Sequence, residues 1–282
     1  MAQLLKGLAV ANALTESLTE RTAALNAKNI TPTLAILRVG ERPDDISYEA
    51  GAMKRCAKVG IAVRQFLLDA DCTQDELLAA VRQINEDPSI HGCLMFRPLP
   101  NKAMEEAACS LLAPEKDMDG MTAGSLAMVF TSKGAGYPPC TAEGCIALLD
   151  HYHIPLEGKR VTVIGRSLVI GRPISMMLQA RNATVTMCHT KTANLAETCR
   201  NAEILVVAAG KASVVNADFT VPGQVVVDVG IHVNATGKLC GDVAFDAVEP
   251  IVEAITPVPG GVGSVTTAIL AKHVIEAAEK AI

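Results

Sequence analysis

The stretch Arg160–Pro173 has the residue types and the order of a phosphate-binding turn. The four residues Val161–Ile164, three of them apolar, predict a short buried strand that ends at Gly165. Pro173 suits the first turn of a following helix, where its missing N–H is not needed. The free backbone N–H groups and the positive dipole end of such a helix bind a pyrophosphate. The stretch therefore predicts the opening of a dinucleotide-binding β-α-β unit.

The glycine spacing departs from the usual dinucleotide fingerprint, G-x-G-x-x-G. Here the order is Gly165-x-Ser167-x-x-x-Gly171, so the glycines alone also fit an ordinary strand-to-helix turn. The elements that follow favour the nucleotide reading, because strands and helices alternate as in a parallel sheet covered on both faces. They are expected at residues 174–181 (helix), 183–188 (strand), 194–201 (helix), 204–209 (strand) and 224–229 (strand).

The end of the second predicted strand indicates which dinucleotide is bound. An NAD site usually has Asp or Glu there, which binds the ribose 2′-hydroxyl. This chain reads Cys188-His189-Thr190-Lys191-Thr192, with no carboxylate, and Arg166 lies in the phosphate turn. Basic and hydroxyl groups suit a 2′-phosphate, so NADP is favoured over NAD. The alternative is that His189 and Lys191 are solvated loop residues.

The chain ahead of this unit predicts an α/β layer of its own, over about the first 120 residues. Its expected helices are 7–28, 46–59, 73–85 and 101–112, and its expected strands are 33–39, 62–68 and 92–96. The likeliest linker is Ser132–Pro139, rich in glycine and proline. A second crossing segment, Thr256–Gly263, leads to a final helix over Val265–Lys280.

Composition narrows the class of protein. The 282 residues allow one large domain or two ordinary ones, and half of them are hydrophobic, enough for a substantial core. The net charge of −5 argues against a nucleic-acid groove. Nine scattered cysteines without a CxxC pair predict free thiols in a reducing cytoplasm, and no metal site is expected. The start does not read as a signal peptide, and no apolar run reaches the ~18 residues of a membrane helix.

Several motifs together resemble the bifunctional methylenetetrahydrofolate dehydrogenase/methenyltetrahydrofolate cyclohydrolase family. The resemblance covers nearly the whole chain in order, and its most specific motifs are the Lys-Asp-x-Asp-Gly motif and the final proline–glycine motif. The motifs are Pro98–Pro100, Pro114–Gly120, Pro139–Thr141, Gly165–Ser167 with Gly171–Pro173, Asp228–Ile231, Gly241–Val243 and Pro257–Gly263.

The resemblance implies a two-domain α/β fold. Residues 1–136, joined by a C-terminal helix over 264–282, would form the folate-binding catalytic domain. Residues 137–263 would form an NADP-binding, Rossmann-like domain with a doubly wound parallel sheet. It also implies a tetrahydrofolate substrate, a homodimer and a cytoplasmic location, with no nucleic-acid or membrane partner.

The resemblance also implies functional residues. Asp119 matches the carboxylate that anchors the pterin, with Asp117 as its structural neighbour, and Pro259, Gly260 and Gly263 match a loop along the folate. Any one of these glycines could instead serve a plain turn. The cofactor would contact Thr141, Gly165, Arg166, Ser167, Gly171, Arg172, Pro173, His189, Thr190, Gly230, Ile231 and Thr266.

The helix expected to carry the hydrolytic chemistry departs from the family pattern. The family has Tyr-x-x-x-Lys-x-Lys-x-Cys, and here Tyr48, Lys54 and Cys56 match while the catalytic lysine is Ala52. Positions 52 and 54 point about 200° apart on a helix, so Lys54 should face away from Tyr48 and the site.

The glutamine that tunes the family's lysine is also missing, because Phe96 takes its place. Arg97 is a new charge beside it. Its high pKa makes it a poor proton shuttle, but it could bind the folate carboxylate or fix Asp119. Tyr48, Ala52, Phe96, Arg97 and Asp119 are therefore expected at the substrate site, with Tyr48 and Asp119 as its catalytic residues.

These observations predict an NADP-dependent methylenetetrahydrofolate dehydrogenase with a weak or lost cyclohydrolase step. One alternative is the full bifunctional enzyme, with water or another residue in place of the lysine. A second alternative is a non-catalytic nucleotide-binding regulatory protein on the same fold, since fold does not fix function. Asp119 and the glycine loop argue against it, because a nucleotide sensor has no need of a folate cleft.

Overall fold

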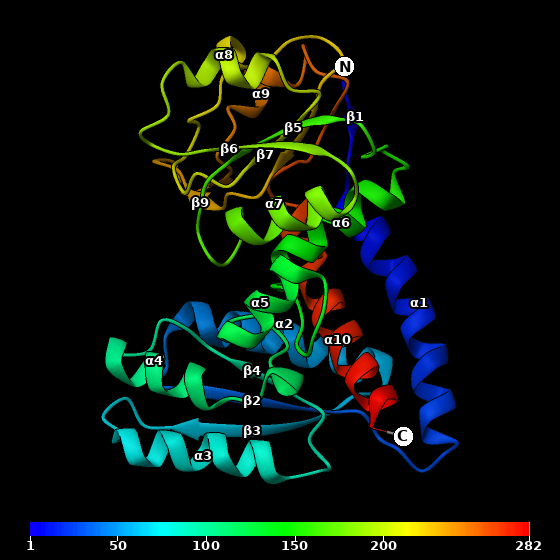
Figure 1. The fold of residues 1–282 in the computed structure, drawn as a ribbon, viewed down its shortest axis with the longest axis vertical. Coiled ribbons are helices and arrows are strands. Elements are labelled where there is room, and N and C mark those ends of the chain that lie inside the picture. The colour runs from blue at the N-terminus through cyan, green and yellow to red at the C-terminus, as the bar shows by residue number, and fades with distance from the viewer. Residues whose placement is uncertain (282) are drawn as a thin grey trace. The chain divides into compact units, whose positions relative to one another are not determined.

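The structure is a computed structural model that describes residues 1–281. The chain folds into two compact units (Figure 1). We call Asn12–Cys140, together with the residues from Thr267 on, the three-strand unit. Met1–Ala11 and Thr141–Thr266 form the six-strand unit. The expected two-domain α/β architecture is confirmed.

The three-strand unit contains a parallel sheet in the order β3-β2-β4. Its strands are β2 (Thr33–Val39), β3 (Ala62–Leu68) and β4 (Gly92–Met95). All seven residues of β2 are buried, as a central strand covered on both faces requires. The sequence predicted the bounds of β2 and β3 correctly and placed the end of β4 one residue late.

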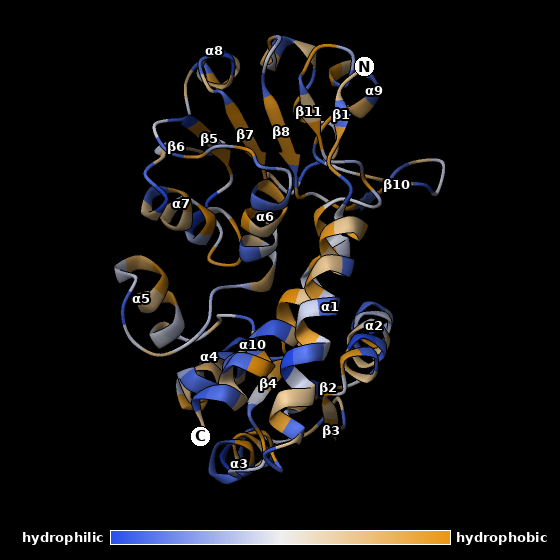
Figure 2. Ribbon diagram, turned by 90° about the vertical axis from the view of Figure 1, so that its right-hand side faces the viewer, coloured by the Kyte–Doolittle hydropathy of each residue, from blue (hydrophilic) through white to orange (hydrophobic). Residues whose placement is uncertain are grey.

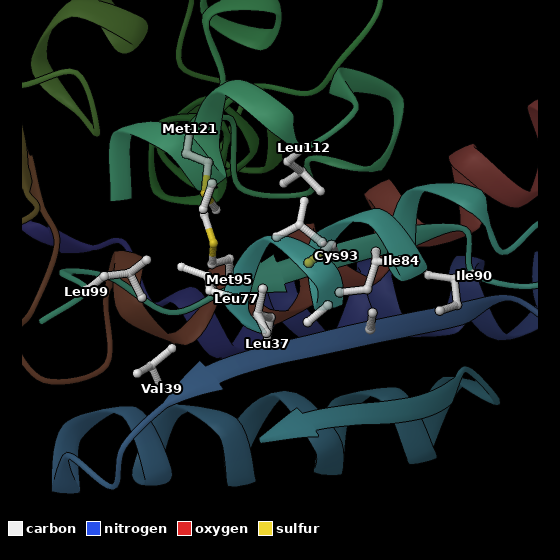
Figure 3. Close-up of a cluster of buried hydrophobic side chains, with 14 residues drawn as sticks. Leu37, Val39, Leu77, Ile84, Ile90, Cys93, Met95, Leu99, Leu112 and Met121 are labelled. Carbon is white, nitrogen blue, oxygen red and sulfur yellow. The ribbon is translucent and has the colours of Figure 1, made fainter. Parts of the chain in front are cut away.

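Helices pack against both faces of this sheet. Leu37 and Val39 of β2 point to one face, where they form a buried apolar cluster with residues such as Leu77 and Ile84 of α3 (Figure 3). Arg38, between them in the strand, points to the other face and bonds to Glu49 of α2. The helices that contribute to this unit are α1 (Gly7–Asn26), α2 (Pro43–Val59), α3 (Gln74–Glu86), α4 (Lys102–Leu111), α5 (Ala123–Thr131) and α10 (Thr266–Lys280).

Two helix starts have clear local causes. Thr73 caps α3 through a reciprocal pair of bonds with Glu76, which is a capping box. Helix α2 was expected from residue 46 but begins at Pro43. Proline fits this position, and Asp44 and Asp45 add acidic groups to the first turn, where the helix dipole favours them.

The six-strand unit contains a second sheet, in the order β1-β11-β8-β7-β5-β6, in which every strand pair is parallel. The four predicted strands are present as β5 (Arg160–Ile164), β6 (Thr184–Cys188), β7 (Ile204–Val207) and β8 (Val225–Asp228). Two further strands of two residues each, β1 (Gln3–Leu4) and β11 (Ala254–Ile255), were not predicted. Strand β7 is hydrophobic along its length, and so is β8 up to its last residue, Asp228 (Figure 2).

The order of the strands creates a switch point in this sheet. From β5 the chain moves to β6 on one side, then to β7 on the other side of β5. In such sheets, ligands bind outside the carboxyl ends of the strands where the direction reverses. The helices that contribute to this unit are α6 (Cys140–His151), α7 (Gly171–Ala180), α8 (Leu195–Arg200) and α9 (Phe245–Val248), and β9 (His232–Val233) pairs with β10 (Leu239–Cys240) as a hairpin.

The first residues of the chain, through Ala11, belong to the six-strand unit, although they were expected in the first domain. Gln3 and Leu4 pair with Ala254 and Ile255 at the edge of the sheet. The physical reason is the unpaired edge of β11, which the backbone of β1 covers. The expected domain boundaries at residues 136 and 263 were drawn by ligand, folate for one domain and NADP for the other. They stay a prediction.

Two further findings concern residues 1–281. All nine cysteines are free thiols, and six of them are buried. None of the described helices combines the length and the apolar composition that a membrane span requires.

Candidate functional site

The phosphate turn at the end of β5 needs its two glycines for steric reasons. Gly165 has φ of +128°, and a Cβ there would lie 2.2 Å from the carbonyl oxygen of Ala208, which follows β7. A Cβ at Gly171 would lie 2.2 Å from the carbonyl oxygen of Gly165. The turn thus closes tightly on itself at the switch point between β5 and β7, which is more than an ordinary strand-to-helix connection requires.

Ser167 stands where the fingerprint has its middle glycine. Its Oγ accepts a hydrogen bond of 3.1 Å from the backbone N–H of Ile170, which stabilises the turn locally. Arg166 and Arg172 are exposed beside the turn, and Pro173 is buried in the first turn of α7, as predicted. The turn therefore combines a helix start with two solvent-facing guanidinium groups, which suits a phosphate ligand.

The end of β6 lies directly beside this turn. The backbone N–H of Gly165 donates to the carbonyl of Cys188 at 2.9 Å, so the loops after β5 and β6 begin side by side. Within the second loop, Lys191 N–H donates to Nδ1 of His189 at 3.1 Å, while Thr190 is exposed. The structure places the predicted 2′-phosphate residues at one sheet edge with Arg166.

Two buried aspartates organise the next loops along this edge, and sequence reasoning missed their role. Asp228 accepts hydrogen bonds of 3.0 Å from the backbone N–H groups of Gly230, Asp242 and Val243. Burial raises the pKa of Asp228 to about 6, against the lowering effect of these bonds. The only signal in the sequence was the pair of motifs in which the two aspartates stand. The predicted cofactor residue Gly230 is fixed by this cluster, and Ile231 next to it is exposed.

Asp242, fully buried, completes the cluster. Its carboxylate accepts bonds from the backbone N–H groups of Gly210 (3.0 Å) and Lys211 (2.9 Å), which follow β7. Its Oδ1 lies 2.7 Å from Nε2 of His232 in β9. The two aspartates therefore tie together the loops that leave β7 and β8.

The proline–glycine loop and the two predicted threonines belong mainly to the six-strand unit. Gly260 has φ of +103°, and its carbonyl accepts from the N–H of Gly7 at 2.9 Å. A Cβ at Gly263 would meet nothing within 4 Å, so the backbone leaves open space at that residue. Thr141 lies in the first turn of α6, and Thr266 begins α10, where its hydroxyl donates to Gly263 O at 3.3 Å.

In the three-strand unit, the position of the family's lysine and glutamine is apolar. Ala52 is fully buried on α2, and Phe96, which follows β4, is 8% exposed. The ring of Tyr48 meets that of Phe96 edge-on, with centroids 6.0 Å apart. Lys54 is exposed, as predicted. The structure thus brings Tyr48 and Phe96 together on the side of α2 that carries Ala52.

A buried ion pair lies next to this group and was not predicted. Arg38 Nε donates to Glu49 Oε2 at 2.7 Å, and the amide of Gln65 donates to the other carboxylate oxygen. Both charged side chains are less than a tenth exposed. The one signal in the sequence was an arginine inside the otherwise apolar run of β2.

Asp119, the predicted pterin anchor, is partly exposed and firmly held. Its Oδ1 accepts a hydrogen bond of 2.9 Å from the backbone N–H of Cys140. Burial raises the pKa of Asp119, while the bonds from Cys140 and the charge of Arg97 act against that rise. Asp117 is fully buried and accepts from the N–H groups of Met121 and Thr122, which is the expected structural role.

Arg97 lies on the same side of the unit. Its guanidinium forms a long ion pair of 3.9 Å with Glu105 and attracts the carboxylate of Asp119. A cation beside a desolvated carboxylate stabilises the ionised form. Among residues 1–281, no cluster of His, Cys, Asp and Glu could hold a metal ion.

Comparisons with known proteins cover both units. The catalytic domain of the tetrahydrofolate dehydrogenase/cyclohydrolase family matches residues 5–119, and its NAD(P)-binding domain matches residues 139–282. The bifunctional protein FolD of Carboxydothermus hydrogenoformans is 50% identical over 281 residues, which are 99% of this chain and 98% of that protein.

Two solved structures have the same fold over nearly the whole chain. The crystal structure of the bifunctional FolD enzyme of Campylobacter jejuni is 36% identical, covers 100% of both chains and superposes with a TM-score of 0.96. The FolD enzyme of Trypanosoma brucei, solved with NADP and an inhibitor, is 33% identical, covers 99% of this chain and 98% of its own, and has a TM-score of 0.92.

These findings confirm the expectation of an enzyme, a dehydrogenase whose cofactor is a nicotinamide dinucleotide. They do not test the roles of the individual site residues, which stay predictions. Two family domains in the expected order and a relative that is half identical over the whole chain leave one assignment: this protein belongs to the tetrahydrofolate dehydrogenase/cyclohydrolase family.

Proposed function

We propose that the chain oxidises methylenetetrahydrofolate to methenyltetrahydrofolate with NADP and then hydrolyses that product to formyltetrahydrofolate. The observation that carries this proposal is the match over nearly the whole chain to relatives that are named bifunctional. The expectation of a weak or lost hydrolytic step has no support in these comparisons. They favour the bifunctional alternative instead.

The dehydrogenase step rests on the placement of two ligands. NADP, when bound, accepts the hydride, and the protein's task is to hold both reacting rings in contact. The turn at Gly165 and Gly171 would bind the pyrophosphate. Asp119 would accept hydrogen bonds from the pterin, since its carboxylate is fixed and partly exposed. A carboxylate fixed in this way also argues against a purely regulatory nucleotide-binding protein.

NADP is proposed over NAD because of the loops after β5 and β6. The loops that carry Arg166 and His189-Thr190 begin side by side, and no carboxylate stands at the end of β6 to receive a ribose 2′-hydroxyl. The Trypanosoma brucei relative, solved with NADP, supports the same choice.

The hydrolytic step must proceed without an ionisable side chain at residues 52 and 96. Ala52 and Phe96 can neither donate nor accept a proton, so we place proton transfer on Tyr48 or on water. Positioned proton transfer contributes typically ~10²–10⁴-fold, so hydrolysis should be slower here than at a site with a lysine.

Two coarser properties complete the proposal. Folate would bind the three-strand unit, and NADP would bind the six-strand unit. We also propose a homodimer in the cytoplasm. The nine free cysteines support a reducing compartment.

The test follows NADPH, methenyltetrahydrofolate and formyltetrahydrofolate separately with purified protein. The proposal expects NADPH to form with NADP in clear preference to NAD, and methenyl absorbance to fall faster than the buffer background. Hydrolysis at the background rate would leave a monofunctional dehydrogenase. Absence of NADPH formation would exclude the enzymatic function altogether.

A further inference from the structure

A buried histidine near the C-terminus reaches the loop that carries Asp119. His273 lies on α10 and has no exposed surface. Its Nδ1 is 2.8 Å from the carbonyl oxygen of Met118, the residue before Asp119. A carbonyl can only accept, so Nδ1 carries the proton in this contact.

Cys140 connects the same carbonyl to the carboxylate. Its thiol donates to Met118 O at 3.2 Å and lies 3.9 Å from Nδ1 of His273. Its backbone N–H donates to Oδ1 of Asp119 at 2.9 Å. On the other side, the N–H of Met118 donates to the carbonyl of Cys93 in β4 at 3.2 Å. Met118, the residue before Asp119, is therefore bonded at both its backbone N–H and its C=O, and the Asp119 carboxylate is bonded as well.

The imidazole is itself held in one orientation. The ring of Tyr137 packs on it with centroids 4.8 Å apart and an angle of 33° between the planes. Lys280 Nζ lies 4.6 Å from the centre of the Tyr137 ring and 3.2 Å from its hydroxyl. Packing alone would be served by a leucine at residue 273. Burying a polar imidazole is unfavourable because the ring loses its hydrogen bonds to water. The hydrogen bond to Met118 offsets this loss, which suggests that the bond has a role beyond packing.

We propose that His273 is a positioning residue for the folate, which holds the Met118 carbonyl and, with Cys140, aims the Asp119 carboxylate at the hydrogen-bond donors of the pterin. This inference rests on the proposed role of Asp119. It assigns His273 no contact with substrate and no proton transfer. Its effect should fall on folate binding and spare the cofactor.

The test compares three variants at His273 with D119N as the reference. In H273N, the side-chain amide nitrogen is attached to Cγ, as Nδ1 is, and can donate from nearly the same place. H273Q carries the same amide one bond farther out, and H273L removes the donor. We expect H273L and H273Q to raise KM for methylenetetrahydrofolate about tenfold, the effect of losing one buried hydrogen bond. KM for NADP and kcat should change less than about twofold, and H273N should stay near wild type.

A pH profile separates positioning from a general loss of structure. Cys140, Asp117 and Arg97 are the groups that act on the pKa of Asp119, and the bonds from Cys140 lower it. If H273Q loosens those bonds, that pKa rises further, and the acid limb of kcat/KM for folate moves to higher pH. A loss of thermal stability alone would not move it.

The outcomes are distinct even if H273L does not fold, because H273N and H273Q form a matched pair. Equal folate KM for H273N and H273Q, or equal rises in KM for folate and NADP, would overturn the positioning role. If D119N leaves the folate KM unchanged, the proposed function of Asp119 fails first. If D119N raises it and H273Q does not, only the present inference fails.

Discussion

Restoring a lysine and a glutamine at residues 52 and 96 should raise hydrolysis without improving hydride transfer. Ala52 is fully buried one helical turn after Tyr48, whose ring contacts Phe96. In A52K/F96Q, the larger side chain at 52 gains the space that the Phe96 ring leaves. The amide oxygen of the new glutamine can accept a bond from the new ammonium.

The magnitude follows from burial. A lysine at a fully buried position has its pKa lowered by up to about 3–5 units, which brings it toward the pH of the reaction. Positioned proton transfer near its own pKa contributes ~10²–10⁴-fold, so we expect the double variant to hydrolyse the methenyl substrate about 10²-fold faster. In A52K alone the ammonium would face the Phe96 ring. We expect a smaller gain and a Tm several degrees lower, because an unpaired buried charge costs several kcal/mol.

The assay is the loss of methenyl absorbance above the buffer background, measured beside NADPH formation. A52M/F96Q is the matched control, since it has similar bulk and no charge. The reasoning is refuted if the folded double variant hydrolyses at the wild-type rate. It is equally refuted if A52M/F96Q gains as much, because size and not proton transfer would then explain the change.

Four further outcomes are expected. R166A should raise KM for NADP about tenfold or more and leave that for NAD unchanged, as kinetics with both cofactors will show, because a guanidinium–phosphate bond contributes roughly 1.5–3 kcal/mol. D119A should raise KM for folate and spare NADP binding, measured by calorimetry. E49A should lower the free energy of unfolding in urea by about 3–5 kcal/mol, because it leaves Arg38 buried and unpaired. The pKa of Asp228 is raised to about 6, so its contribution to stability is full below the unfolded pKa near 4 and is lost as pH rises through 6. Urea titrations at pH 4.5 and 7 should therefore differ less in D228N than in wild type.

The regular elements of both units could largely be predicted from local patterns. The bounds of β2 and β3 were predicted correctly, and Thr73 was expected at the start of α3. Helices α5 and α6 were missed. Their glycine, serine and threonine residues weaken the helical signal, and packing overrides this propensity. Strands of two residues, such as β1, are too short to show the alternation of apolar and polar residues that identifies a strand.

Site residues could be predicted only where they belong to a sequence motif. Gly165 and Asp119 stand in recognisable motifs, whereas Arg38 with Glu49, and His273 with Met118, are tertiary pairs. Residues 118 and 273 are far apart in the chain, and no local rule links a histidine on one helix to a carbonyl in a distant loop. Arg38 was visible as a charge in an apolar strand, but its partner was not.

The pairing of β1 with β11 has a consequence for synthesis of the chain. Leu4 leaves the ribosome about 250 residues before its partner Ile255, so the edge of the six-strand sheet cannot close until residue 255 has been made. The three-strand unit also waits, since α10 is the last helix to emerge. A nascent chain stalled after residue 140 would thus carry an unpaired β1 and would lack His273 beside Met118. Neither unit is complete in such a fragment, because each of them needs segments that follow residue 140.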